Sequence, residues 1–394
     1  MYEKRQASMK RIESIDAIRG LSLFGILIVN ILSFHAPYFL YGGKSETSWL
    51  DDFILMLIDI FVQASFYPLF ALLFGIGIYM MYERQESLGN HSNTILIRRF
   101  IILSIIGMIH GLLLWYGDIL LTYGVFGLMS LAFLQKNIKT LLKWAGCLLV
   151  FSTLLFTWMS YEVRNKIEGY SDVVAIEQSI INFRGSFDDI FQQNLQNWLI
   201  SYSPIQWVIM CFVILPMFLI GIVIKKSGWI DDPSKHDKQI KRWIFVSFIL
   251  FLVFKIGPYT FGNPIWLEYA QDVIGGSSLS LFYFLALLLL FKGRNLHQIR
   301  RILSNIGKLS LSNYMFQSAI CFVIFYGVGF NLYHQLNMSE LMAIALMIYI
   351  FQLVISQWYI KKFYFGPFEW IYRTLTYAKR QPFVKEAFHE KKMD

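Results

Sequence analysis

Apolar runs of membrane-crossing length recur along almost the whole of this 394-residue chain, and they restrict the folds that it can adopt. The hydrocarbon core of a bilayer is about 30 Å thick, so a helix that crosses it needs about 20 mostly apolar residues. Such runs occupy residues 17–34, 53–82, 100–115, 118–134, 140–158, 205–224, 243–261, 273–291, 309–330 and 341–360. Hydrophobic residues make up 56% of the chain and charged residues 15%, which excludes an ordinary soluble domain. The sequence therefore predicts an all-α, polytopic transmembrane helix bundle of about ten spans.

The positions of the basic residues predict how this bundle is oriented. The formal net charge is +9, but the basic residues form short clusters between apolar runs, which is typical of membrane orientation rather than nucleic-acid binding. The clusters expected in the cytoplasm are Lys4 to Arg11, Arg84 to Arg99, Lys136 to Lys143, Lys225 to Arg242, Lys292 to Lys308 and the residues from Lys361 onward. The opposite loops carry only Lys44, Arg164, Lys166 and Arg184. We expect a multi-pass protein among membrane lipids, with both termini cytoplasmic and no nucleic-acid partner.

The spacing of the runs predicts four regions. Residues 1–158 form an N-terminal five-span core, residues 159–204 an outer loop domain, and residues 205–365 a second five-span region. Residues 366–394 form a cytoplasmic tail, in which aromatic and basic residues alternate after Gly366-Pro367 as in a helix that lies on the inner leaflet. A loop as long as the outer one usually has a function, such as a lid or a platform for an acceptor.

Two ionisable residues in one predicted hairpin are the strongest candidates for chemistry. His110 lies near the middle of the third run, and Asp118 begins the fourth run directly after Gly117. An ionisable group at that depth is costly unless it faces protein or water, so it indicates a functional site. The alternative is structural, since His110 lies within Gly107-x-x-x-Gly111 and could form a hydrogen bond to a closely packed helix.

Other spans place polar residues at helical spacing, as expected for side chains that turn inward to line a cavity. The residues predicted to line it are Asp16, Asn30, Gln63, Tyr123, Asn313 and Gln317. Hydrogen bonds between helices would explain the same stripes equally well. The three cysteines lie inside apolar runs without metal-ligand spacing, so neither a disulfide nor a metal site is predicted.

A set of motifs spread over the chain identifies a family. These motifs are Asp16-x-x-Arg19-Gly20, Leu69-Phe70-x-x-Leu73-Phe74-Gly75, His110-Gly111 with Gly117-Asp118-Ile119-Leu120-x-x-Tyr123, Leu311-x-Asn313-Tyr314-x-x-Gln317, and Gly366-Pro367-x-Glu369-Trp370-x-x-Arg373. As a set they resemble the YeiB-type family of bacterial inner-membrane proteins, whose function is poorly defined. The resemblance covers nearly the whole chain and implies a location in the bacterial cytoplasmic membrane.

The opening segment, DAIRGLSLFGILIVN followed by His35-Ala36, also resembles the heparan-α-glucosaminide N-acetyltransferase family of integral-membrane acyltransferases. This resemblance implies a helical protein that takes acetyl-CoA from the cytosol and acetylates an acceptor on the far side. It also implies a reactive histidine just after the first span, and His35 occupies that place. His35 could equally be an ordinary loop histidine.

These observations favour an acyltransferase that moves an acyl group from a cytoplasmic acetyl-CoA or other acyl-CoA donor to a small-molecule, glycan or lipid-linked acceptor. His110 would act as the base or carry the acyl group, Asp118 would orient it, and His35 is a second candidate base. Asn30, Asn313 and Gln317 would donate hydrogen bonds to the developing oxyanion. Arg19 and Lys308 would bind the donor's phosphates, although basic residues are expected at inner helix ends in any case.

Two other functions remain open. A transporter, or an accessory protein of transport, for a small molecule or lipid would use the same buried polar groups for binding and proton relay. A purely structural membrane partner explains those groups least well.

Overall fold

The computed structural model describes residues 12–40, 48–89, 93–293 and 295–385, and their regular structure is helical throughout. Over these residues, eight helical segments are long and apolar enough to cross a membrane: Glu13–His35, Trp49–Ser87, Thr94–Leu113, Ile138–Glu162, Pro204–Lys226, Asp237–Phe261, Ile265–Leu290 and Met338–Lys362. Two further predicted spans are helical but shorter, at Leu120–Phe133 and Ser310–Phe325. The all-α polytopic bundle predicted from the sequence is confirmed. The basic residues Lys4, Arg5, Lys10, Arg11 and Lys44 and the tail residues 386–394 lie outside the described part of the chain.

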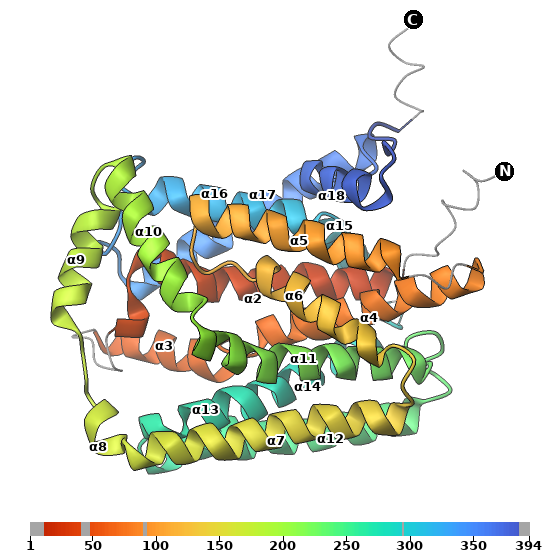
Figure 1. Cartoon of the computed structure of the whole chain (residues 1–394), viewed down its shortest axis with the longest axis horizontal. Helices are drawn as coiled ribbons and strands as arrows, with labels where there is room; N and C mark the ends of the chain where they lie inside the picture. Colours follow the sequence, from red (N-terminus) through yellow and green to blue (C-terminus); the bar gives the residue numbers. More distant parts are fainter. Residues whose placement is uncertain (1–11, 41–47, 90–92, 294, 386–394) are drawn as a thin grey trace, which may run out of the picture.

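Helix α2 (Glu13–His35) lies at the centre of the bundle, alongside α4 (Phe66–Ser87), α15 (His297–Lys308), α16 (Ser310–Phe325) and α17 (Met338–Lys362) (Figure 1). Glycines let these helices approach closely. A methyl group at Gly20 would collide with the carbonyl oxygen of Leu303 on α15, and one at Gly307 would collide with that of Asp16. Small residues at such crossings allow the close van der Waals contact that holds membrane helices together.

The second predicted span, the run of residues 53–82, consists of two helices. Helix α3 (Trp49–Phe61) ends before a four-residue turn at residues 62–65, where Ala64 adopts a left-handed φ of 54°, and α4 then begins at Phe66. Pro68 lies in the first turn of α4, a position where its missing N–H costs no helical hydrogen bond. The overlong run is therefore interrupted before its proline.

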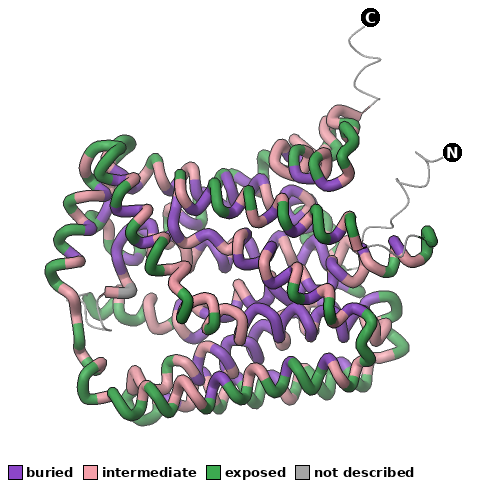
Figure 2. The backbone as a smooth tube through the Cα atoms, viewed as in Figure 1, coloured by how far each residue is buried: buried purple, intermediate pink, exposed green. Residues whose placement is uncertain are grey.

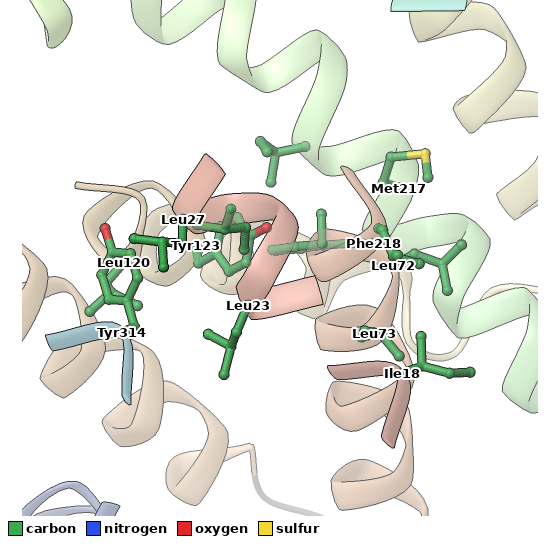
Figure 3. Packing of buried hydrophobic residues seen from close by; sticks show 14 of the residues in the cluster. Ile18, Leu23, Leu27, Leu72, Leu73, Leu120, Tyr123, Met217, Phe218 and Tyr314 are labelled. Carbon is green, nitrogen blue, oxygen red and sulfur yellow. The ribbon is translucent and has the colours of Figure 1, made fainter. Parts of the chain in front are cut away.

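The buried core lies between α2, α4 and α11 (Pro204–Lys226), as the buried positions in Figure 2 show. Figure 3 shows Tyr123 among Leu27 and Phe218 in this core, with Leu120 and Tyr314 beside it. Tyr123 belongs to α6 (Leu120–Ser130), which continues into the short helix η2 (Leu131–Phe133). Its phenol donates a hydrogen bond to the carbonyl oxygen of Tyr67 at 2.7 Å.

An outer layer covers one side of this core (Figure 1). It contains α7 (Ile138–Glu162), α12 (Asp237–Phe251) and α14 (Ser277–Leu290), and α7 and α12 expose many apolar side chains, as expected for a surface in lipid. Between α12 and α14 the chain is irregular. It passes through η3 (Leu252–Ile256), η4 (Gly257–Phe261), η5 (Ile265–Leu267), α13 (Glu268–Ala270) and η6 (Gln271–Gly276), of which η3 and η6 are π-helical.

The long connection predicted as an outer loop domain folds into short helices at the end of the bundle where α2 ends (Figure 1). They are α8 (Arg164–Ile167), α9 (Val173–Phe183) and α10 (Phe187–Ser201), and the short helix η1 (Tyr38–Leu40) contacts α9. A capping box between Ser186 and Asp189 begins α10. We call α9 and α10 the cap.

Helix α18 (Pro367–Tyr377) packs against the start of α16 and against α5 (Thr94–Leu113) at the other end of the bundle. The Glu369 carboxylate accepts hydrogen bonds from the backbone N–H groups of Leu311 and Ser312, at 2.7 and 3.0 Å. These donors belong to the first turn of α16, where helical N–H groups lack partners and the helix dipole favours an anion. The helix predicted to lie on the inner leaflet is thus anchored to the bundle itself.

Candidate functional site

His110 and Asp118 form a buried pair in the hairpin between α5 and α6. The His110 Nδ1 and Asp118 Oδ1 atoms are 2.9 Å apart, and the two residues are 3% and 6% exposed. The other carboxylate oxygen, Oδ2, accepts the backbone N–H of Leu121 at 2.9 Å, in the first turn of α6. His110 Nε2 is buried without a hydrogen-bond partner. With Nδ1–H donating to the carboxylate, Nε2 is left as the atom that can accept a proton.

Glycine makes this pairing possible. A methyl group at Gly107 would collide with the backbone nitrogen of Leu121 and lie 2.6 Å from Asp118 Oδ2. The Gly107-x-x-x-Gly111 pattern therefore serves helix packing, as the structural alternative supposed. It also brings α6, and with it Asp118, within reach of His110.

A cavity of about 230 Å³ adjoins this pair. Its walls come from α2, the α3–α4 turn, the α5–α6 hairpin, α10, α11 and α16: Ile26, Val29, Asn30, Val62, Phe66, Tyr67, Tyr116, Gly117, Asp118, Ile119, Thr122, Ser201, Tyr202, Gln206, Trp207, Met210 and Tyr314. Asp118 is the only one of these residues that carries a formal charge at neutral pH. His110 does not line the cavity. It lies one side chain away, bonded to Asp118 and with its ring centroid 5.3 Å from that of Tyr314.

Burial also raises the pKa of two tyrosine side chains that line this cavity. Tyr202 donates its O–H to the carbonyl oxygen of Asp118 at 2.6 Å. Burial, and then the nearby Asp118 carboxylate, raise the pKa of Tyr202, and burial raises the pKa of Tyr116. Both phenols therefore remain protonated and can act as hydrogen-bond donors but not as bases.

The structure places His35 apart from this pair. Its Nε2 accepts the backbone N–H of Leu336 at 3.1 Å, and its carbonyl oxygen accepts that of His334 at 2.8 Å. The His35 ring lies edge-on to Phe325, 5.7 Å between centroids. These contacts join the end of α2 to the segment between α16 and α17, as expected of a histidine that holds a loop.

The other predicted site residues are distributed over several places. Of the six predicted to line a cavity, Asn30 lines the one beside Asp118. Asn313 donates to the Ser356 hydroxyl at 3.2 Å, and Gln317 donates to the Gln352 side chain at 2.8 Å, so both join α16 to α17. This is the interhelical bonding that the sequence left open as an alternative. Tyr123 is bonded to Tyr67, and Gln63 lies half-buried in the α3–α4 turn.

Asp16, Arg19 and Lys308 lie toward the opposite end of α2 from the pair. Arg19 forms an ion pair with Asp16 at 2.7 Å, and Lys308 donates to the Asn305 side chain at 3.1 Å. Among the described residues, no group of three or more His, Cys, Asp or Glu side chains is placed to hold a metal ion.

Sequence reasoning missed a buried ion cluster. Lys255, in η3, is completely buried, and its ammonium lies 2.9 Å from Asp59 on α3 and 2.7 Å from Asp272 on η6. Tyr259 donates a hydrogen bond to the second oxygen of Asp59. Asp59 and Lys255 lie inside apolar runs and Asp272 directly precedes one, and the charge of Lys255 in particular signals that it needs a partner.

Comparison with known proteins places the whole chain in one family. A model described as a protein of unknown function, DUF418, matches residues 224–379. The uncharacterized protein YxaH of Bacillus subtilis (strain 168) is 31% identical over 96% of this chain and 97% of its own length. An uncharacterized 39.9 kDa protein from the amylase 3' region of Bacillus acidopullulyticus is 27% identical over 96% and 98%, and the uncharacterized protein YeiB of Escherichia coli (strain K12) is 26% identical over 96% and 100%. The chain therefore belongs to the YeiB-type family of membrane proteins.

Proposed function

We propose that this protein is an integral-membrane acyltransferase, which transfers a short acyl group from a cytoplasmic acyl-CoA to a hydroxyl or amine acceptor. The observation that carries the proposal is the His110–Asp118 pair, buried beside a cavity toward the end of the bundle that carries the cap. A carboxylate that fixes one imidazole nitrogen and leaves the other free is a frequent arrangement for base catalysis. The resemblance of the N-terminal segment to membrane acetyltransferases supports the same reaction.

The chemistry assigns roles to the His110–Asp118 pair and to Asn30. The acceptor O–H or N–H would lose its proton to the His110–Asp118 pair while its oxygen or nitrogen forms a bond to the acyl carbon. The thioester C–S bond breaks, and the proton passes to the CoA sulfur, so that acyl-CoA and acceptor become acylated acceptor and free CoA. Asn30 is the neutral side-chain donor on α2 that lines the cavity and can stabilise the oxyanion.

The size and charge of the cavity support a short acyl chain. At about 230 Å³ it is smaller than the roughly 300–1,000 Å³ that surrounds a drug-sized ligand or cofactor. None of its walls is cationic, so the CoA phosphates would remain outside, toward Arg19 and Lys308. We infer that this end of the bundle faces the bacterial cytoplasm with both termini, since the basic clusters lie there.

Ligand binding tests the donor side of the proposal. The protein in nanodiscs should unfold at a higher temperature with acetyl-CoA than without a ligand, because a ligand of the native state stabilises it by RT ln(1 + [L]/Kd). Arg19→Ala should reduce this stabilisation, whereas His110→Gln should preserve it. No stabilisation by acetyl-, butyryl- or octanoyl-CoA at millimolar concentration would contradict the proposal.

Transport of a small molecule is a second candidate, and the Asp59–Lys255–Asp272 cluster favours it. Ionisable groups inside a membrane bundle often belong to ion or proton pathways. A transporter would let a solute or proton cross proteoliposome membranes without chemical change, and Lys255→Met would abolish that flux. Release of free CoA without such flux would instead support the acyltransferase.

A further inference from the structure

The turn that carries the His110–Asp118 pair is held by residues from a distant part of the chain. Helix α5 ends at Leu113, three residues after His110, so carbonyl groups in its last turn lack helical partners. The Asn194 side chain of α10 donates to two of them, the carbonyl oxygens of Gly111 and Leu112, at 2.9 Å each. Its own oxygen accepts the backbone N–H of Tyr116 at 2.7 Å. One buried amide thus bonds to both ends of the turn.

Two further residues, Trp198 in α10 and Tyr202 directly after it, contact the same hairpin. The Trp198 indole lies against Gly111, where a methyl group would be 2.8 Å from its Nε1 atom. Tyr202 donates to the carbonyl oxygen of Asp118 itself at 2.6 Å. Asn194, Trp198 and Tyr202 are four residues apart, so they form one face of α10 and its C-terminal end. We call these three residues the α10 stripe.

We propose that Asn194 and Tyr202 are positioning residues for the His110–Asp118 pair, so that the cap controls the geometry of the site from the acceptor side. Asn194 fixes the chain directly after His110, and Tyr202 fixes the backbone of Asp118. An event on the outer face that moves α10 would move both members of the pair. The inference rests on the proposed function for its kinetic consequence, and its structural consequence can be measured without turnover.

The tautomer of His110 reports the geometry of the pair. Asp118 holds the proton on Nδ1, and His110 Nε2 has no partner that would hold it there. In protein with ¹⁵N-labelled histidine in nanodiscs, the signal lost in His110→Gln identifies this ring. The native protein should show the Nδ1–H form, whereas Asn194→Ala should show a mixture of both tautomers. Gln196→Ala, at an exposed position on the same helix, is the matched control and should keep the native signal.

Kinetics supply the second readout. A misplacement of about 1 Å can cost on the order of 100-fold in rate, so Asn194→Ala should lower kcat by about that factor while KM stays within about twofold. Tyr202→Phe removes a single hydrogen bond and provides a milder variant if Asn194→Ala does not fold. Its expected effect is a smaller fall in kcat with partial mixing of the tautomers.

The outcomes separate the two proposals. A native tautomer signal in both Asn194→Ala and Tyr202→Phe, equal to that of Gln196→Ala, would overturn the positioning role. A mixed signal in a protein whose native form turns over no acyl-CoA would support the positioning role and contradict the acyltransferase.

Discussion

At the scale of single residues, close packing and buried charge determine which substitutions the bundle can tolerate. Gly307 and Gly20 bring the backbones of α2 and α15 together, and the nearest neighbour of each in the crossing is a main-chain carbonyl oxygen, which cannot move aside as a flexible side chain would. The hairpin of the candidate site depends in the same way on Gly107.

Gly307→Ala should therefore destabilise the protein, because the added methyl group collides with the carbonyl oxygen of Asp16. Overpacking of this kind costs about 1–3 kcal/mol. Gly77→Ala on α4 is the control, since apart from the backbone of its own helix and its chain neighbours no atom lies within 4 Å of the position that its methyl group would occupy. Unfolding in mixed detergent micelles measures both variants, and equal stability would refute the packing argument.

Lys255→Met tests the buried ion cluster. It would leave Asp59 and Asp272 facing each other without a cation, and removal of one partner from a buried pair costs about 3–5 kcal/mol. The triple variant Asp59→Asn, Lys255→Met, Asp272→Asn carries no unpaired charge and should be more stable than Lys255→Met alone. If the single and triple variants unfold alike, charge balance does not explain the cluster.

At the scale of elements, the segment between α16 and α17 depends on neutral histidines. His334 adopts a left-handed φ of 58°, and its N–H donates to the carbonyl oxygen of His35. Burial, and then the nearby Arg184, lower the pKa of His334 below its ordinary value of 6.5. The neighbouring His35 accepts a hydrogen bond at Nε2, which requires that atom to be without a proton.

Acidification should therefore destabilise this segment. As the pH falls below 6.5, the His334 imidazole becomes protonated in the unfolded chain, whereas its lowered pKa keeps it neutral to a lower pH in the native protein. The unfolded state therefore binds more protons, and the free energy of unfolding decreases as the pH falls. His334→Asn, which suits the left-handed backbone, should lose part of this dependence. Unfolding temperatures at pH 7.5 and 5.5 measure the difference, and an unchanged pH dependence in His334→Asn would contradict the assignment.

The elements also show which features the sequence could predict. The apolar runs predicted the helices because the length and composition of each run indicate a helix without reference to the rest of the chain. His110 and Asp118 could be paired because they are eight residues apart in one hairpin. Asn313 and Gln317 were predicted to face inward and are buried, but their partners lie on α17 rather than in a cavity. The periodicity of polar residues predicts which face of a helix points inward, but it does not predict which helix packs against that face.

The contacts that the sequence could not predict join residues that lie far apart in the chain. Lys255 pairs with Asp59 from 196 residues away, and Asn194 reaches a turn about 80 residues earlier in the chain. No local pattern links such residues. The stripe Asn194, Trp198 and Tyr202 does show helical spacing, and this spacing was the one available signal that the cap faces the hairpin.

At the scale of the whole molecule, the orientation of the bundle decides from which side each substrate arrives. A reporter fused after Tyr170, beside the cap, should read outside, and one fused after Lys238, at the start of α12, should read cytoplasmic, because basic residues cluster around α12's start. A cytoplasmic signal at Tyr170 would reverse the predicted orientation and place the cavity on the donor side.

Acyl transfer by the His110–Asp118 pair is the central claim, and single-turnover release of free CoA tests it most directly. Purified protein in nanodiscs would be mixed with acetyl-CoA and extracted membrane lipids or sugars as acceptors, and the free thiol and labelled product would be followed together. Loss of a positioned base typically costs about 10²–10⁴-fold, so His110→Gln should slow release by that factor, while His297→Gln at an exposed position should not. Equal rates for the native protein and His110→Gln would contradict the account.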